Sequence, residues 1–180
     1  ATDRLGCLTE GFCLRRLHVP QGIVLADAGY GNDTSFRSGL ADLKLHYVVG
    51  IQGSTAVWAP GTEPLPARTW SGNGRKTKLL RRDETTKPVK VNTLARSLPR
   101  KAWKNIRWRE GSKGDLVSRF APLRVRPSHR DYWRAEPWPQ EWLLIEWPED
   151  KDEPLKYWLS TMPAETTIAT LVDTAKLRWR

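Results

Sequence analysis

Asp27 is the residue whose type and position best suit it to do chemistry. It follows the apolar run at residues 23–26 and precedes the glycine-containing segment at residues 28–31. A carboxylate at the end of a buried strand offers the hard oxygen ligands that divalent cations prefer. Two-metal cleavage of a phosphodiester bond needs several converging carboxylates, so Asp27 requires partners from elsewhere in the fold. An Asp before Ala-Gly also forms turns or caps helices, and this second interpretation stays open.

The elements around Asp27 are predicted to form a β-α-β unit. Residues 23–26 and 47–51 are short, continuously apolar runs, a pattern typical of strands buried on both faces. The residues between them have one apolar face at helical spacing, and Asn32 or Asp33 can cap that helix. A strand, a helix and a second strand in this order predict a parallel pair with Asp27 at its carboxyl edge.

Helices are also predicted near both ends of the sequence. Leu5, Leu8 and Phe12 form an apolar stripe over residues 3–17. A last helix is expected to begin at residues 165–167, and its apolar pattern runs on to the final residues with no stop signal. Because the sequence also starts without Met, we expect it to be a piece of a longer protein.

The segment at residues 52–163 has a different character. Pro and Gly residues mark irregular chain after residue 51, and alternation with a period of two follows, which predicts a β-rich region. A hairpin turn is expected at residues 110–114 and a short helix after Asn92. The predicted strands span residues 87–91, 106–109, 117–125, 142–147 and 157–160.

The positive charge is concentrated in one part of the chain. Of the net charge of +10, residues 75–134 hold 19 Lys and Arg against 5 Asp and Glu, whereas the rest holds 11 against 15. Such an excess of cations is the electrostatic footprint of a polyphosphate partner. The alternative is that these side chains only solvate a β-rich surface.

Composition excludes several classes of protein. The hydrophobic content of 39% and mean hydropathy of −0.59 fit a soluble globular chain, and no apolar run approaches the ~20 residues of a membrane helix. We therefore expect no membrane partner and a cytoplasmic location. Cys7 and Cys13 are too few for a disulfide scaffold. His129 and Asp131 could suggest a general base with an orienting carboxylate, but residues 129–131 are expected in a solvated loop.

Several short strings, taken in order, resemble bacterial insertion-sequence transposases of the DDE superfamily endonuclease type. They are VLADAGYG at 24–31, YVVG at 47–50, WREG at 108–111, RVRP at 124–127 and LRWR at 177–180. The resemblance covers essentially the whole chain. It implies a core like that of ribonuclease H and three acidic residues that bind Mg²⁺ (or Mn²⁺) for DNA cleavage and strand transfer.

Asp27 matches the second of those three acidic residues, as a catalytic residue and a metal ligand. The first lies on a strand upstream of the helix at residues 3–17, and the glutamate falls two positions beyond Arg180. Where related transposases have a tyrosine three positions before the arginine of the glutamate signature, this sequence has Ala175. Arg178 is the one position of that signature carried over, as a contact to a DNA phosphate.

The resemblance and the patterns together predict an α/β fold, a partial ribonuclease H-like core with a large β-rich insertion. The core comprises residues 1–51, the basic insertion 52–163, and the start of the C-terminal core helix 164–180. Double-stranded DNA is the expected partner, bound by a homodimer in the bacterial nucleoid. The residues expected to contact DNA are Arg178, Arg180, Arg109, Arg119, Arg124, Arg126 and Trp108.

The leading hypothesis is a metal-dependent DNA transposase, of which this chain alone is expected to be inactive. A rival hypothesis is a nucleic-acid-binding module without catalysis, in which Asp27 only caps a helix. A third is the remnant of a decayed mobile element. Most of the tryptophans are expected to build the core, since each buries a large ring, whereas Trp103, Trp108 and Trp133 lie among arginines and could stack on bases.

Overall fold

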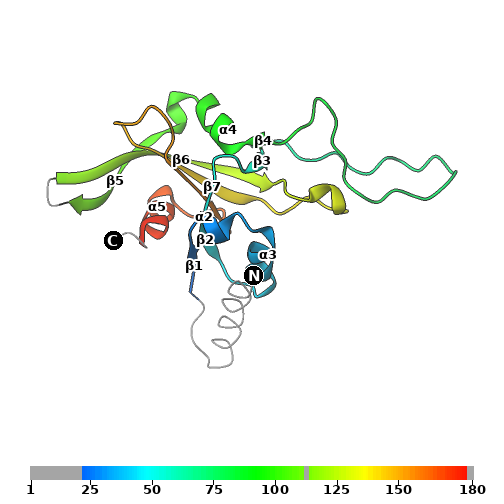
Figure 1. The fold of residues 1–180 in the computed structure, drawn as a ribbon, viewed down its shortest axis with the longest axis horizontal. Coiled ribbons are helices and arrows are strands. Elements are labelled where there is room, and N and C mark those ends of the chain that lie inside the picture. Colours follow the sequence, from blue (N-terminus) through cyan, green and yellow to red (C-terminus); the bar gives the residue numbers. More distant parts are fainter. Residues whose placement is uncertain (1–21, 112–113, 178–180) are drawn as a thin grey trace, which may run out of the picture.

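The computed structural model describes residues 22–111 and 114–177, which form a mixed α/β fold around one twisted sheet (Figure 1). In the described part, the sheet has eight strands in the order β1-β2-β8-β7-β6-β3-β4, and β5 pairs with β6. The strands are β1 (Val24–Ala26), β2 (Tyr47–Ile51), β3 (Ala56–Trp58), β4 (Val89–Lys90), β5 (Lys104–Gly111), β6 (Gly114–Pro127), β7 (Glu141–Trp147) and β8 (Lys156–Ser160). The helices are α2 (Ala28–Gly31), α3 (Thr34–Asp42), α4 (Val91–Ser97) and α5 (Ile168–Lys176), with short 3₁₀ turns at Arg100–Ala102 and Asp131–Trp133.

The predicted β-α-β unit is present. Strands β1 and β2 are parallel, with Val24 opposite Tyr47. Of the two candidate caps, Asp33 is the one that caps α3, since its carboxylate accepts a hydrogen bond from the amide of Ser35 at 2.8 Å. The expectation that β1 is buried on both faces is wrong: its residues are only half-buried, because β1 is the last strand of the described sheet and has a single neighbour.

The β-rich segment continues the same sheet. Strand β8 is antiparallel to β2, with Leu159 opposite Val49, and β7 and β6 follow in antiparallel order. Strand β8 therefore covers the second edge of β2, although it follows β2 by more than a hundred residues in the sequence. The division into residues 1–51, 52–163 and 164–180 stays a prediction, but hydrogen bonds of the sheet join its first two parts.

Several predicted elements have different lengths in the structure. Strand β4 spans two residues where five were expected, because Pro88 has no amide to donate to a ladder. Helix α4 begins at Val91, whose amide donates to the carbonyl of Thr55 at 2.9 Å. Strand β3 was not predicted, since three residues are too few to show an alternation. Strands β5 and β6 form a longer hairpin than expected, which projects from one end of the sheet (Figure 1).

Two apolar clusters cover the two faces of the sheet. Alternate residues of a strand belong to opposite clusters, as Val48 and Val49 of β2 do. Helices α3 and α4 pack on the face of Val49, whereas α5 packs on the face of Val48 through Leu171 and Val172. Helices α3 and α5 therefore pack on opposite faces of strand β2.

Some predictions fall outside the described residues. The helix expected at residues 3–17 and the last three residues of the sequence belong to this group, as does part of the turn at residues 110–114. Among the helices that are described, none combines the length and the apolar character needed to span a membrane.

Candidate functional site

Asp27 lies at the carboxyl end of β1, as predicted, and its side chain is exposed. It is also the N-cap of α2: its Oδ1 atom accepts a hydrogen bond from the amide of Gly29 at 3.0 Å. Residues 28–31 therefore form a single helical turn. The cap fixes the orientation of the carboxylate at the edge of the sheet, so the helix-capping and the ligand interpretations describe the same geometry.

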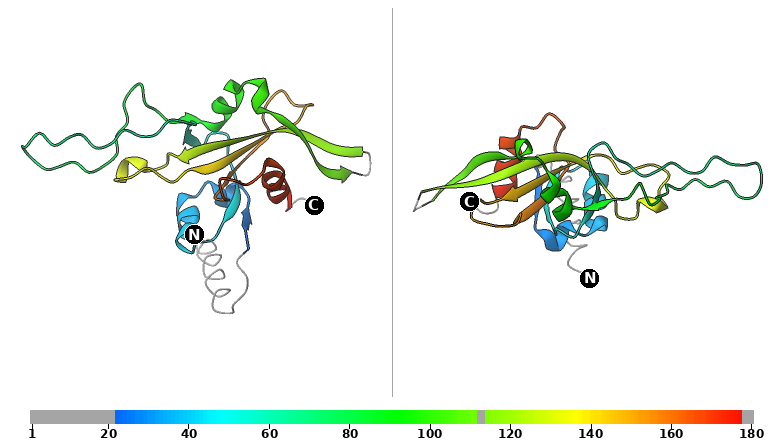
Figure 2. Two further views of the ribbon diagram at one scale, coloured as in Figure 1. Left: turned by 180° about the vertical axis from the view of Figure 1, so that it is seen from behind. Right: turned by 90° about the horizontal axis from the view of Figure 1, so that it is seen from above.

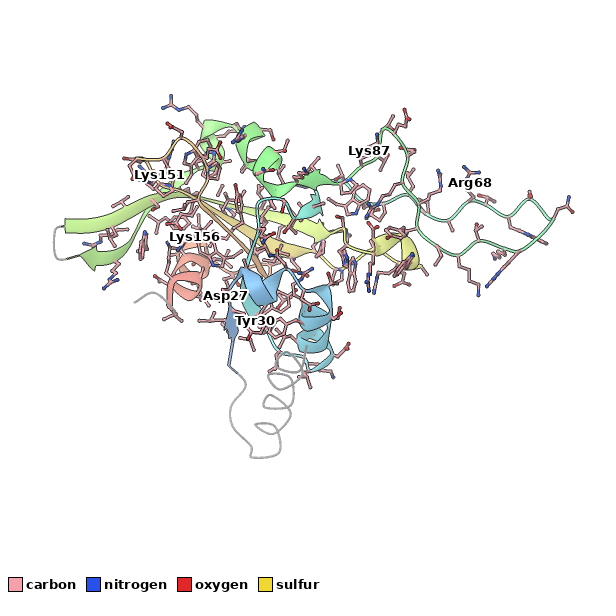
Figure 3. The ribbon with its side chains drawn as sticks, in the orientation of Figure 1. Asp27, Tyr30, Arg68, Lys87, Lys151 and Lys156 are labelled. Carbon is pink, nitrogen blue, oxygen red and sulfur yellow. The ribbon has the colours of Figure 1, made fainter. Side chains whose placement is uncertain are left out.

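Asp27 borders a cavity of about 230 Å³. Gly50 of β2, Lys156 of β8 and Ala175 of α5 also line this cavity, together with apolar side chains of the sheet. Figure 3 labels Asp27 and Lys156 in this part of the molecule. The cavity therefore joins the end of β1 to the last described helix, the two parts of the chain that the resemblance assigns to the catalytic core.

A close contact between two glycines sets the position of Asp27. A Cβ atom added to Gly31 would lie 1.9 Å from the carbonyl oxygen of Gly50, and one added to Gly50 would lie 3.1 Å from the amide of Ala28. Helix α2 therefore lies directly against the backbone of β2. The sequence shows glycines at positions 29, 31 and 50. The close approach of α2 to β2 leaves no room for a side chain at Gly31 and little at Gly50.

The described residues do not by themselves fit a complete Mg²⁺ or Mn²⁺ site. Mg²⁺ takes six oxygen ligands in near-octahedral geometry, and within residues 22–111 and 114–177 no three His, Cys, Asp or Glu side chains gather to hold a metal. Asp27 contributes one carboxylate, and Lys156 lines the same cavity. A metal at this edge would need further acidic ligands.

Three of the arginines expected to contact DNA bind the protein itself. Arg119 Nε donates to the carbonyl of Trp147 at 3.4 Å, Arg124 Nη2 to that of Gln140 at 2.8 Å, and Arg126 Nη1 to that of Trp138 at 2.7 Å. The guanidinium groups of Arg119 and Arg124 also lie 5.0 Å from the rings of Trp147 and Trp142. These contacts link β6 to β7 and the segment before it. Whether the same arginines contact DNA stays a prediction.

Of the remaining residues of that set, the described ones, Arg109 and Trp108, lie on β5 and do not line the cavity at Asp27. Arg109 is exposed on β5, and the half-buried Trp108 has its ring 3.8 Å from the ammonium group of Lys176. Arg178 and Arg180 lie outside the described residues. Of the described residues that line the cavity, none belongs to the predicted DNA-contact set. Among the described residues, the candidate catalytic residue and the candidate DNA contacts therefore do not share a cavity.

The prediction of a solvated loop at residues 129–131 is wrong for Asp131. This residue is 1% exposed, because its carboxylate accepts a hydrogen bond from the indole of Trp58 at 2.6 Å and one from Arg82 at 2.5 Å. His129 is exposed, and its Nδ1 lies 2.8 Å from the hydroxyl of Thr34. Partial burial and neighbouring arginines lower the pKa of His129.

Buried charges elsewhere in the sheet were missed by sequence reasoning. Glu141 is buried at the start of β7, and one of its carboxylate oxygens has no hydrogen-bond partner among the described residues. Burial raises the pKa of Glu141, although Arg37 and Arg124 act against this, and burial also raises the pKa of the neighbouring Tyr47. Lys176 lies within the apolar pattern of α5, and this position in the sequence was a signal that its side chain is buried.

No curated protein shows significant sequence similarity to the chain. A family model described as DDE superfamily endonuclease matches residues 6–115, a range that includes Asp27 and both strands of the β-α-β unit. Since the match spans more than half of the sequence, the chain belongs to the DDE superfamily endonuclease family.

Proposed function

We propose that this chain is part of a bacterial insertion-sequence transposase that cleaves and rejoins phosphodiester bonds of DNA. The membership of the family supports a nuclease or transposase parent that acts on DNA. The observation that carries the proposal is the exposed Asp27 at the carboxyl end of β1, beside a cavity that α5 also lines. We infer that Asp27 is the catalytic carboxylate contributed by this part of the protein.

The metal, Mg²⁺ or Mn²⁺, would supply Lewis-acid stabilisation of charge at the reacting phosphate when bound. Because Asp27 alone does not complete a site, the proposal extends to acidic ligands outside the sequence, which the family resemblance leads us to expect before the helix at residues 3–17 and just after Arg180. We therefore propose that the chain is inactive alone. Its own contribution is to hold one carboxylate in place through the amide of Gly29.

The other parts of the proposal concern the organisation on DNA. Residues 52–163 are proposed as an insertion on the DNA side of the core, with Arg109, Arg119, Arg124, Arg126 and Trp108 as candidate contacts. Their positive charge supports this assignment. The whole protein is proposed to act as a homodimer on double-stranded DNA in the bacterial nucleoid.

The test uses the polypeptide extended at both ends by its flanking coding sequence. We expect it to cleave duplex DNA that carries the ends of the element, in the presence of Mg²⁺. The Asp27→Asn variant should lose cleavage, because the amide is a poor metal ligand, and should bind the same DNA with unchanged affinity. Cleavage by Asp27→Asn at the rate of the unmodified protein would refute the role of Asp27.

A second candidate function is a nucleic-acid-binding module without catalysis. The hydrogen bond from the amide of Gly29 to Asp27 favours it, because this contact gives the carboxylate a structural role without a metal. Such a module would bind DNA equally well in EDTA. It would also show no metal-dependent cleavage in the extended polypeptide, which separates it from the transposase.

A further inference from the structure

A long arm leaves the sheet between β3 and β4. Residues 64–82, here called the basic arm, run outward and back as two limbs and project from the opposite end of the molecule to the β5–β6 hairpin (Figures 1 and 2). Figure 3 labels Arg68 on this projection, away from Asp27. At its tip, Gly72 and Gly74 have positive φ angles of 96° and 75°, which turn the chain back on itself.

The basic arm carries positive charge alone. Its sequence holds six Lys and Arg residues and no acidic residue. The two limbs enclose an open hollow of about 980 Å³, and five of the cations line it. These five are Arg68, Arg75, Lys76, Lys78 and Arg81.

The base of the basic arm is firmly attached to the sheet. Leu65 and Arg81 exchange two backbone hydrogen bonds of 2.9 Å, and the amide of the buried Leu80 donates to the carbonyl of Arg134 at 2.8 Å. Arg82 donates to the buried carboxylate of Asp131 at 2.5 Å. These contacts fix the direction in which the two limbs leave the protein, so the cations beyond them are held out from the sheet together.

Three cations of the basic arm differ in their surroundings from the arginines of β6. Arg119, Arg124 and Arg126 donate to backbone carbonyls of β7 and of the segment before it. By contrast, Arg75, Lys76 and Lys78 are exposed around the hollow, and no acidic side chain lies within the arm to neutralise them. Like charges gathered in this way repel one another, and a polyanion relieves that repulsion.

We propose that the basic arm binds the sugar–phosphate backbone of double-stranded DNA, with Arg75, Lys76 and Lys78 as phosphate contacts. Duplex DNA carries one negative charge per ~1.7 Å of its axis, so several phosphates can face the two limbs at once. The proposal rests on the proposed function, which makes DNA the partner, and adds the surface that binds it. The contact is independent of sequence, because it is made to phosphates.

The test measures binding of the 180-residue chain to a short DNA duplex by fluorescence anisotropy over a series of NaCl concentrations. The variant replaces Arg75, Lys76 and Lys78 with Gln. Each phosphate contact contributes about 0.9 to the slope of log K against log salt concentration. We therefore expect the slope to fall by roughly two to three and the affinity at low salt to fall at least tenfold in this variant.

A matched control removes the same charge elsewhere. Lys44, Lys101 and Lys151 are exposed outside the basic arm, and replacing all three with Gln changes the net charge equally. The control should keep the slope of the unmodified chain. Equal losses in both variants would mean that only net charge matters, and an unchanged slope in the arm variant would mean that the arm does not bind; either result overturns the proposal.

Trypsin digestion gives a second measurement that needs no substitution. Trypsin cleaves after Lys and Arg, so cuts after Arg75, Lys76 and Lys78 should slow when saturating duplex DNA is added, whereas the cut after Lys44 should not. Unprotected arm sites at saturation would overturn the proposal. The proposed function is tested separately, because cleavage lost in Asp27→Asn of the extended polypeptide supports it whether or not the arm binds DNA.

Discussion

The ammonium nitrogen of Lys176 lies 2.6 and 2.7 Å from the two carboxylate oxygens of Glu146, and both side chains are 3% exposed. The ion pair attaches the last turn of α5 to β7. The ring of Trp108 lies 3.8 Å from the same nitrogen, so the β5–β6 hairpin also contacts the pair. Because the adjacent Ala175 lines the cavity at Asp27, this ion pair positions the helix that approaches the candidate catalytic carboxylate.

Removing one member of this ion pair should destabilise the protein strongly. Glu146→Gln leaves the ammonium group buried without its counter-ion, and Lys176→Met does the same to the carboxylate, so each should lower the free energy of unfolding by about 3 to 5 kcal/mol. The double variant has no buried charge at this site. Its loss of unfolding free energy should therefore be much smaller than the sum of the two single losses. Urea unfolding of all four proteins gives the coupling energy, and additive losses would show that the pair does not act as a unit.

Glu141→Gln should stabilise the protein in a pH-dependent manner. Burial raises the pKa of Glu141 above its usual value of 4.5, so the folded state binds more protons at this site than the unfolded state once the pH exceeds that value. Stability contributed by the protonated form is therefore lost as the pH rises through the folded pKa. Gln keeps the shape and the contact with Tyr47 without ionising, so the gain should be larger at pH 7 than at pH 4.

The control for this prediction is Glu165→Gln, since Glu165 is exposed. Its effect on the thermal midpoint should be small and equal at both pH values. If Glu141→Gln shifts the midpoint equally at pH 4 and pH 7, the ionisation of Glu141 does not differ between the folded and unfolded states. In that event Arg37 and Arg124 offset the cost of burial.

Local patterns predicted the unit around Asp27 well. The apolar runs, the helical spacing between them and the cap at Asp33 depend on residues close in sequence, and the structure contains all three. The pairing of β8 with β2 could not be predicted in this way, because Leu159 and Val49 meet only through the folding of everything between them. Long-range pairing leaves no periodic signal in a single sequence.

The candidate site was predicted only in part for the same reason. Asp27 was recognised from the end of its strand, but Lys156 and Ala175 reach the cavity from distant elements. The arginines of β6 were judged by charge alone, and their contacts with carbonyls and rings depend on the neighbouring strand. The basic arm contains no regular element, so the sequence indicated irregular chain there but not its projection from the sheet.

Gly31→Ala should destabilise the protein and displace Asp27. The added methyl group would lie 1.9 Å from the carbonyl oxygen of Gly50, a backbone atom that cannot rotate away. Overpacking of this kind costs about 1 to 3 kcal/mol. Urea unfolding should detect that loss, while Gly22→Ala, whose Cβ would meet no atom within 4 Å, should be neutral or slightly stabilising. Equal stability of the two variants would show that α2 can move off β2 freely.

Two substitutions at Asp27 separate its role as a cap from its role as a ligand. Asn is as good an N-cap as Asp, so Asp27→Asn should keep the hydrogen bond from the amide of Gly29 and unfold at nearly the same urea concentration. Asp27→Ala loses the cap and should cost about 0.5 to 2 kcal/mol. Only the carboxylate attracts a cation, so millimolar Mn²⁺ should broaden the amide resonances of Gly29 and Tyr30 in the unmodified chain and in neither variant. Broadening that persists in Asp27→Asn would assign the cation to another group and leave Asp27 with its structural role alone.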